Sequence, residues 1–219
     1  MNTVNSDFMY KIPDDSIFGP NDLGEGITYG YVRSIKDETE LIRLLKLRLG
    51  GFFIRQVQPL QDAHSAFPLA VMTCVGIETL GVIFVPKKEG DSSYQFVETT
   101  SKMHQIFGRK PDETFLESFA AIWSEKKKSD FNSYGKVLYK FFRNTMIHGY
   151  QGKGAFLSYE DTDKIEIKSE SGFMVINPDW LWNTYKAFFE KRFSDVLEAQ
   201  NNNPERQNCL QYIRGFLLE

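Results

Sequence analysis

Three side chains that can act together on a phosphodiester occur within one six-residue segment of the chain. Arg143 and His148 are five positions apart, and Asn144 directly follows the arginine. An arginine guanidinium binds phosphate through two parallel hydrogen bonds. A histidine moves protons near neutral pH because its ordinary pKa is about 6.5. An asparagine beside them can orient either group. The segment therefore carries the residue types needed for phosphate binding and proton transfer.

The residues before this segment predict the helix that positions it. Apolar side chains recur at three- and four-residue steps over Tyr134–Met146, which is the pattern of an amphipathic helix. Asn132 or Ser133 can cap its start. Gly149 can end it, because glycine adopts the left-handed conformation after a helix without strain. Arginine and histidine also occur in a last helical turn simply because they complement the helix dipole, so the residue types alone leave both readings open.

The segment Arg143–His148, with the sequence RNTMIH, resembles the motif of the HEPN superfamily (higher eukaryotes and prokaryotes nucleotide-binding domains). Its members have an arginine, four to six further residues and then a histidine near the end of a bundle helix, often with a polar residue after the arginine. The resemblance extends as a helical pattern over Asp37–Gly154, and its specific part is the motif itself. It implies an up-and-down helical bundle that dimerises and brings two motifs together.

The resemblance implies two functions. Many members are metal-independent endoribonucleases of toxin and phage-defence systems, in which the ribose 2′-OH attacks the adjacent phosphodiester. In that case His148 is the general base or acid, Arg143 stabilises the phosphate, and Asn144 orients the histidine or the phosphate. One motif supplies one histidine, so acid and base together imply a homodimer. The alternative is a non-catalytic HEPN-like bundle that binds a nucleotide or a partner protein.

A third interpretation is a helical protein in which the motif is coincidental. For the enzyme, the expected partners are RNA or a nucleotide, a second copy of the chain, and an antitoxin or regulator protein. No cofactor and no metal ion are expected. A structure separates the interpretations, because an enzyme requires the arginine and the histidine to be exposed in a cleft.

Three more charged residues are candidates for binding or orienting groups. Lys140 lies on the predicted motif helix, and Lys153 lies in the glycine-rich exit from it, where it can contact a phosphate. Glu78 lies near the middle of the most apolar segment of the chain, where an unpaired charge is costly. We hypothesise that Glu78 reaches Arg143 or His148 and orients it. The alternative is a carboxylate at the helix surface or bonded to a hydroxyl group.

The charge distribution and the cysteine content indicate which kind of ligand and which cellular location suit this chemistry. The net charge is −3, but the range Ser101–Lys153 holds ten Lys and Arg against five Asp and Glu, which suits a ligand that carries phosphate. Cys74 and Cys209 offer neither a disulfide framework nor zinc-ligand spacing, so a reducing cytoplasm is the expected location. His64 and His104 are expected to be surface or capping residues without metal-ligand spacing.

The predicted fold is mainly α. Residues 37–219 form a single helical-bundle domain, and residues 1–36 form an N-terminal arm in which Ile27–Ile35 can be a short strand. Asp37–Leu60 is the first long helix, with Phe52 on its apolar face. Ala66–Val85 is long enough to cross a bilayer, but the glutamate within it and the lack of a second apolar span favour a buried core helix and no membrane.

A small antiparallel β-hairpin is predicted within residues 155–176, before the C-terminal helices. Its candidate strands alternate or are rich in β-branched residues and are separated by turn-type clusters. Two later asparagine–proline pairs, at Asn177 and Asn203, predict helix starts with an asparagine cap and proline at the first helical position.

Overall fold

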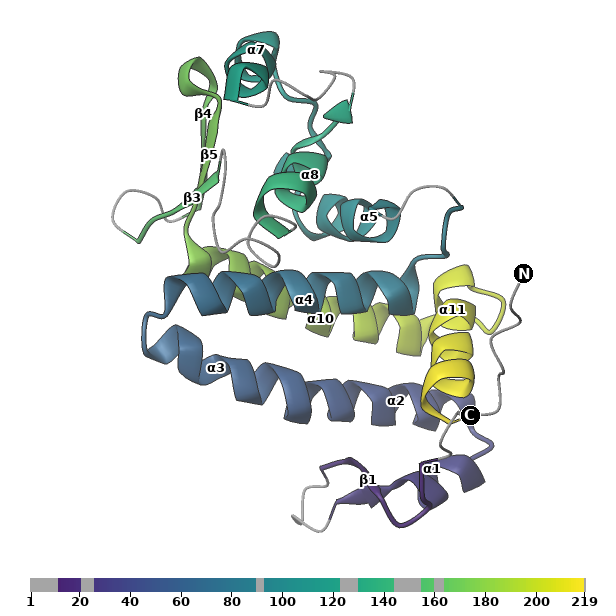
Figure 1. Cartoon of the computed structure of the whole chain (residues 1–219). Coiled ribbons are helices and arrows are strands. Elements are labelled where there is room, and N and C mark those ends of the chain that lie inside the picture. The colour runs from purple at the N-terminus through teal and green to yellow at the C-terminus, as the bar shows by residue number, and fades with distance from the viewer. Residues whose placement is uncertain are drawn as a thin grey trace, which may run out of the picture.

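The computed structural model describes residues 12–20, 26–89, 93–122, 130–143, 155–159 and 164–218. Most of these residues are helical (Figure 1). The helical elements are α1 (Tyr29–Ser34), α2 (Glu38–Leu49), η1 (Gly50–Ile54), α3 (Arg55–Asp62), α4 (Ala66–Phe84), α5 (Tyr94–Met103), α6 (Gln105–Gly108), α7 (Glu113–Ile122), α8 (Tyr134–Val137), η3 (Leu138–Arg143), η4 (Ser169–Ser171), α10 (Pro178–Glu198), α11 (Pro204–Tyr212) and η5 (Ile213–Leu217). The strands are β1 (Ile17–Gly19), β2 (Ile27–Thr28), β3 (Ala155–Leu157), β4 (Ile165–Lys168) and β5 (Phe173–Ile176).

Helix α4 is the centre of the molecule. It packs against α10, α5, α11 and α3, and Figure 1 shows α4 and α10 crossing the middle of the molecule, with α2 and α3 below them and α5 and α8 above. Within the described ranges, α4 is the helix that is long and apolar enough to cross a membrane, with a mean hydropathy of 1.9. Its apolar residues instead form the inner core with those of α10. The prediction of a core helix is therefore confirmed.

Two glycines let neighbouring elements approach α4 closely. A Cβ atom at Gly76 would lie 2.6 Å from Cζ of Tyr185 on α10 and 2.7 Å from Cε1 of Phe53 on η1. A Cβ atom at Gly81 would lie 2.9 Å from the backbone oxygen of Gln95 on α5. These distances are shorter than van der Waals contact, so the packing of α4 against three neighbours depends on the missing side chains.

The predicted first helix is present, but a π-helical turn divides it. Helix α2 passes into η1 at Gly50 and then into α3 without a break. A π turn accommodates an extra residue and rotates the side chains that follow it. Phe52 was predicted to face the core and is instead 48% exposed. The Arg48 guanidinium covers its ring, with Cζ 5.5 Å from the ring centroid.

The N-terminal arm contains a helix where a strand was predicted. Strand β2 pairs antiparallel with β1 and ends at Thr28. The Thr28 hydroxyl then accepts a hydrogen bond from Tyr31 N at 3.3 Å and caps α1. The side-chain cap ends the strand because it satisfies a free N–H of the first helical turn. Phe18, Tyr29 and Val32 of the arm are buried, and this part of the chain packs on α2.

The small sheet has the order β3-β5-β4. Strands β4 and β5 form the predicted antiparallel hairpin, with Gly172 in the turn at φ +64°. The pairing within residues 155–176 was predicted to be antiparallel, but β3 runs parallel to β5, at the edge of the sheet opposite β4. β5 is the most buried of the strands and carries the sequence FMVI. An apolar strand gains most from the central position because both its edges are paired and its faces are covered.

Candidate functional site

The motif helix begins at a serine cap and is anchored in the core. Of the two predicted caps the structure uses Ser133, whose Oγ accepts a hydrogen bond from Lys136 N at 3.2 Å. Tyr134, Val137, Leu138 and Tyr139 are buried. The sequence predicted an α-helix throughout, whereas the segment becomes π-helical from the second turn, in η3. Single π-helical turns inside helices occur frequently at functional sites.

The predicted motif begins where η3 ends. Arg143 is the last residue of η3, and its side chain lies outside the described part of the structure. Asn144, His148 and Lys153 lie outside the described residues altogether. The geometry of the motif, including the expected cleft, is therefore not tested by the structure and stays a prediction.

Two of the residues predicted to bind or orient a ligand, Lys140 and Glu78, are half-buried on different elements. Lys140 lies on η3 and Glu78 on α4, and each interacts with other groups. Helix α5 packs against both α4 and α8, and the ring of Tyr139 on η3 lies 5.4 Å from that of Phe96 on α5. The α5 helix thus connects the two elements. A direct contact of Glu78 with the motif remains a hypothesis.

A polar cleft lies along the first turns of α10, and the described residues that line it are all on this helix or its cap. It has a volume of about 530 Å³. Its lining residues recur on one face of the helix, at Asn177, Asp179, Trp180, Asn183, Thr184 and Ala187. The sequence positions this face, because Asn177 Oδ1 accepts a hydrogen bond from Trp180 N at 3.0 Å and Pro178 occupies the first helical position. The predicted cap at Asn177 is thereby confirmed.

His64 lies at the edge of this cleft, in the turn between α3 and α4. Its Nδ1 atom is 3.7 Å from Asp179 Oδ2, and its ring meets the Tyr159 ring edge-on at a centroid distance of 5.4 Å. Its side chain is 73% exposed, as the sequence led us to expect. Its φ of +48° is unusual for a residue with a Cβ atom, and such strain is found most often at functional sites.

Asp179 and Tyr159 carry polar atoms that the described residues leave without hydrogen bonds. Asp179 Oδ1 is sealed from solvent without a partner, and so is the Tyr159 hydroxyl. Burial, and then the charge of Asp179, raises the pKa of Tyr159 above its usual value. Buried polar groups in folded proteins are nearly always hydrogen-bonded, and an exception needs an explanation. Both atoms are sealed from solvent, so a ligand in the open cleft does not reach them in this arrangement.

His104 packs against Trp180, one of the residues that line the cleft. The ring of His104 meets the Trp180 ring edge-on at 5.2 Å, and its Nδ1 accepts a hydrogen bond from Ile106 N at 3.4 Å, so that it caps α6 as predicted. Burial lowers the pKa of His104, and the charges of Arg109 and Lys164 lower it further. Trp180, which lines the cleft, thus also contacts a histidine that lies near two cations.

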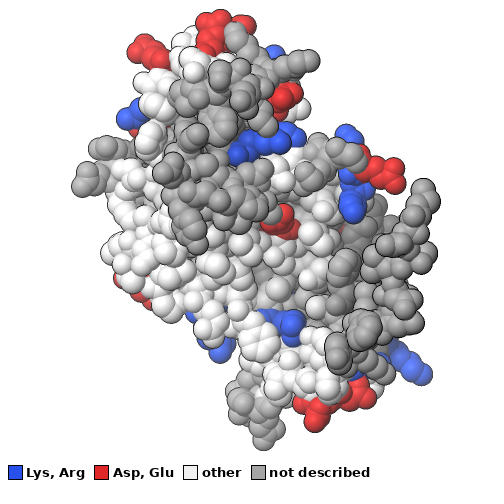
Figure 2. Space-filling model, in the orientation of Figure 1, with Lys and Arg blue, Asp and Glu red and all other residues white. Residues whose placement is uncertain are grey.

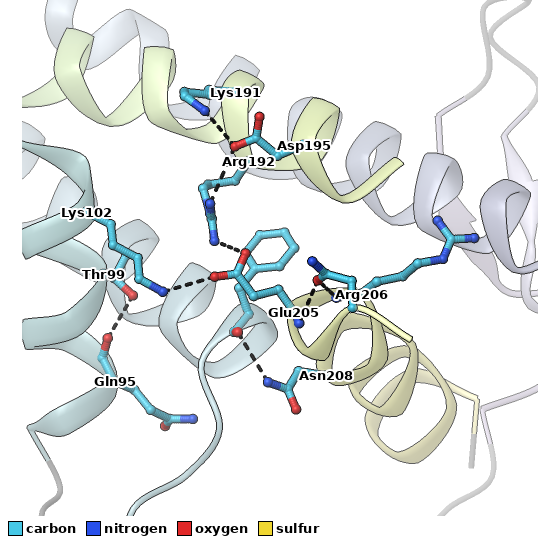
Figure 3. A network of polar contacts seen from close by, with 11 residues as sticks. Gln95, Thr99, Lys102, Lys191, Arg192, Asp195, Glu205, Arg206 and Asn208 are labelled. Atoms are coloured by element: carbon cyan, nitrogen blue, oxygen red, sulfur yellow. Dashed lines mark hydrogen bonds and ion pairs between the residues drawn. The ribbon is translucent and has the colours of Figure 1, made fainter. Parts of the chain in front are cut away.

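A second polar cluster joins α5, α10 and α11, and Figure 3 shows it from close by. The carboxylate of Glu205 accepts from Lys102 Nζ at 3.0 Å and also from Arg192 Nη2. Arg192 Nη1 also lies 3.5 Å from Asp195 Oδ2, which in turn accepts from Lys191 Nζ at 2.7 Å. Because these charges are bonded to one another, the cluster holds helices together and offers no free group to a ligand.

Sequence reasoning missed the cleft. The sequence indicated only that a helix begins at Asn177 and that His64 is a surface or capping residue. The Asn177 cap and the proline that follows it place Asp179, Trp180 and Asn183 close together on α10, and this part could have been found from their spacing. The approach of His64 could not, because it depends on how the α3–α4 turn packs against α10.

The charges of the described residues are dispersed on the face drawn in Figure 2, where basic and acidic side chains are interspersed. Within the described ranges no group of three or more His, Cys, Asp or Glu side chains lies close enough together to hold a metal ion. Comparisons with family models, with curated proteins and with solved structures give no match. The candidate sites are therefore assigned from residue chemistry alone.

Proposed function

We propose that this chain is a HEPN-like helical protein of the cytoplasm that cleaves RNA without a metal ion. The observation that supports the proposal is the position of the Arg-Asn-x-x-x-His segment. It continues directly from a helix that is capped by Ser133, anchored by buried side chains and completed by a π-helical turn ending at Arg143. The described part of this helix therefore fixes the position at which the segment begins.

The proposed reaction forms a bond between the ribose 2′-oxygen and phosphorus and breaks the bond from phosphorus to the 5′-oxygen. The products are a 2′,3′-cyclic phosphate and a 5′-hydroxyl end. His148 takes the proton of the 2′-OH or supplies one to the leaving 5′-oxygen. Arg143 binds the non-bridging phosphate oxygens and stabilises the charge that develops on them. Asn144 orients the histidine or the phosphate.

Charge near the motif supports a phosphate-bearing substrate. The range Ser101–Lys153 is locally basic although the whole chain is acidic, and Lys140 and Lys153 lie within it as additional phosphate contacts. A homodimer with facing motifs supplies the second histidine that two-sided acid–base catalysis needs. By the family resemblance, the setting is a toxin or phage-defence system with an antitoxin or regulator as partner.

A second candidate is a non-catalytic HEPN-like bundle that binds a nucleotide or a partner protein. The observation in its favour is electrostatic: the net charge is −3, and acidic side chains lie among the basic ones on the face in Figure 2. Proteins that bind RNA through its backbone usually present a continuous basic surface.

The first test is incubation of the purified protein with a mixed RNA pool in EDTA, which removes divalent metals. We expect the wild type to leave cyclic phosphate ends, and we expect His148→Ala and Arg143→Ala each to lower the cleavage rate by about 100-fold or more. Lys191→Ala, an exposed cation on α10, is the matched control and should cleave at the wild-type rate.

The three outcomes separate the candidates. Cleavage by the wild type and the control alone supports the ribonuclease. Equal cleavage by wild type and His148→Ala refutes the assignment of the histidine. No cleavage by any of the proteins, at concentrations where the wild type is folded, removes the enzyme and leaves the binding protein.

A further inference from the structure

We propose that the cavity beside η1 binds an amphipathic carboxylate, which is a molecule with an apolar chain and a single carboxylate at one end. The cavity lies between α10 and the continuous helix formed by α2, η1 and the start of α3, in the lower layers of Figure 1. Its volume is about 560 Å³, which is within the range of small-ligand sites. The proposal goes beyond the proposed function and does not depend on it.

The cavity is elongated along one face of the continuous helix. The lining residues of this helix recur every three or four positions, at Arg43, Lys46, Leu47, Gly50, Gly51, Ile54 and Arg55. From residue 43 to residue 55 a helix rises by about 18 Å. Phe189, Glu190 and Leu197 of α10 complete the lining together with Pro20, which lies directly against Gly51. This shape suits a ligand that is longer than it is wide.

The middle of the cavity is apolar and partly open to water. Leu47, Ile54 and Leu197 are half-buried, and Phe189 is buried in the core. At Gly50 an added Cβ atom would meet nothing within 4 Å, so the cavity extends to the main chain at this point. An alkyl chain along this surface would be removed from water together with the side chains that it covers, which is favourable.

The charges around the cavity leave one cation without a counter-charge. Arg43 Nη2 lies 2.6 Å from Glu40 Oε1, and Lys46 Nζ lies 2.6 Å from Glu190 Oε2. Arg55 also lines the cavity, and it makes no hydrogen bond or ion pair with the residues that the structure describes. The electrostatic balance of the lining is therefore positive, and the unbalanced charge is at the α3 end.

The unbalanced charge selects the head group of the ligand. A guanidinium binds a carboxylate through two parallel hydrogen bonds, and one carboxylate balances one arginine. A phosphate monoester carries about −1.5 to −2 charges at neutral pH, which is more than Arg55 balances. An alcohol gains no ion pair, and an amine is repelled. The carboxylate is therefore placed at Arg55, with its chain along the stripe past Gly50.

The experiment measures the binding of decanoate by calorimetry, below the concentration at which it forms micelles. Decanol and decylamine carry the same chain with a neutral and a cationic head group, and acetate carries the carboxylate without the chain. We expect decanoate to bind more tightly than decanol and decylamine. We expect acetate not to bind at concentrations where decanoate saturates the site.

The first variant fills the cavity. Gly50→Leu introduces a side chain at a position where a Cβ atom has open space, and it should weaken decanoate binding by about tenfold or more. Gly215→Leu is the matched control, because Gly215 is exposed and a Cβ atom there also meets nothing within 4 Å. It should bind decanoate as the wild type does.

The second variant removes the charge. Arg55→Gln should weaken decanoate binding by about threefold or more and abolish the preference for decanoate over decanol. Arg109→Gln makes the same change at an exposed arginine that does not line the cavity, and it should bind as the wild type does. Thermal unfolding confirms that each variant is folded. Because Arg55 is exposed, Arg55→Gln tests the site even if Gly50→Leu does not fold.

The outcomes decide the proposal without reference to RNA cleavage, which is measured separately. Decanoate binding that is weakened in Gly50→Leu and Arg55→Gln and kept in both controls supports the site. No binding of decanoate overturns it. Equal affinity for the three head groups, affinity for acetate as high as for decanoate, or unchanged affinity in both cavity variants also overturns it.

Discussion

His104 is a residue whose surroundings favour its neutral form. Burial lowers its pKa first, and the nearby cations Arg109 and Lys164 lower it further. In the neutral form its Nδ1 accepts the hydrogen bond that caps α6. Protonation would remove that acceptor and place a third positive charge beside two others. The histidine therefore couples the folding of this region to pH.

We predict that acidification destabilises the protein through His104. A histidine with a lowered pKa contributes its full stability above the unfolded value, which is near 6.5, and loses it as the pH falls from there toward the folded value. His104→Asn keeps a capping acceptor and does not titrate. Thermal unfolding at pH values between about 7.5 and 5.5 should show a smaller loss of stability in His104→Asn than in the wild type.

This pH range also separates the titration of His104 from that of the carboxylates whose pKa values are lowered. The pKa values of Glu40 and Asp112 are lowered from 4.5 and 3.8 by hydrogen bonds to Arg43 and Ser169 respectively. Stability from those groups is lost only below these values. An equal loss of stability in wild type and His104→Asn would show that His104 does not contribute.

At the scale of the elements, the packing of α4 depends on glycines at positions where neighbouring elements approach it closely. The sequence of α4 alone does not show which elements these are. Gly76 lies where α4 meets both Tyr185 and Phe53. We predict that Gly76→Ala lowers the free energy of unfolding by about 1–3 kcal/mol, because the added methyl group overpacks rigid rings. The loss should exceed the roughly 1 kcal/mol that alanine gains in helix propensity.

Gly50 is the matched control for this prediction. It is helical, with φ −58°, and a Cβ atom there would meet nothing within 4 Å. Gly50→Ala should therefore be neutral or stabilising, by up to about 1 kcal/mol. Urea unfolding of both variants checks the pair. If Gly76→Ala proved as stable as Gly50→Ala, the close approach of the three elements would be wrong.

The sequence predicted the elements best where a local signal sets them. Asn177, Ser133 and His104 all cap helices as expected, because a side-chain acceptor before a helix acts on the next three residues. The π-helical turns in η1 and η3 were not predicted. A π turn changes the hydrogen-bond register without a change of residue type, so apolar spacing does not reveal it. Phe52 was misplaced for that reason.

The sheet and the cleft could be predicted only in part, for a related reason. The β4–β5 hairpin follows from a short turn with a glycine, whereas the insertion of β5 between β3 and β4 depends on which strand the core covers. In the same way the sequence indicated that Asn177 begins a helix, but not that His64 would lie against Asp179. Contacts between distant parts of the chain leave no local pattern. The motif at Arg143–His148 stays a prediction.

At the scale of the whole molecule, the charge cluster in Figure 3 connects three helices through one carboxylate. Glu205 lies in the first turn of α11 and bonds Lys102 of α5 and Arg192 of α10. The side chains of Glu205 and Arg192 are 24% and 14% exposed, so solvent screens their interaction incompletely. Burial lowers the pKa of Arg192, and Asp195 opposes the change.

We predict that Glu205→Gln lowers the free energy of unfolding by about 1–3 kcal/mol, because the amide keeps one acceptor of the two and no longer neutralises Lys102 and Arg192. Glu198→Gln, at an exposed position late in α10, should change it by less than about 0.5 kcal/mol. Urea unfolding measures both. A loss in Glu205→Gln no larger than in the control would contradict the role of the cluster.

Bonds between the two ends of the chain also have a consequence for synthesis. Arg33 Nε donates to the backbone oxygen of Leu218, 185 residues later, and Arg206 donates to the Thr39 hydroxyl over a separation of 167 residues. A ribosome adds roughly 5–20 residues per second. Roughly 10–30 s therefore pass between the synthesis of Thr39, on α2, and the synthesis of its partner Arg206. These bonds between α11 and the N-terminal part of the chain can form only after α11 has been translated, so they are completed after all the residues between them have been synthesised.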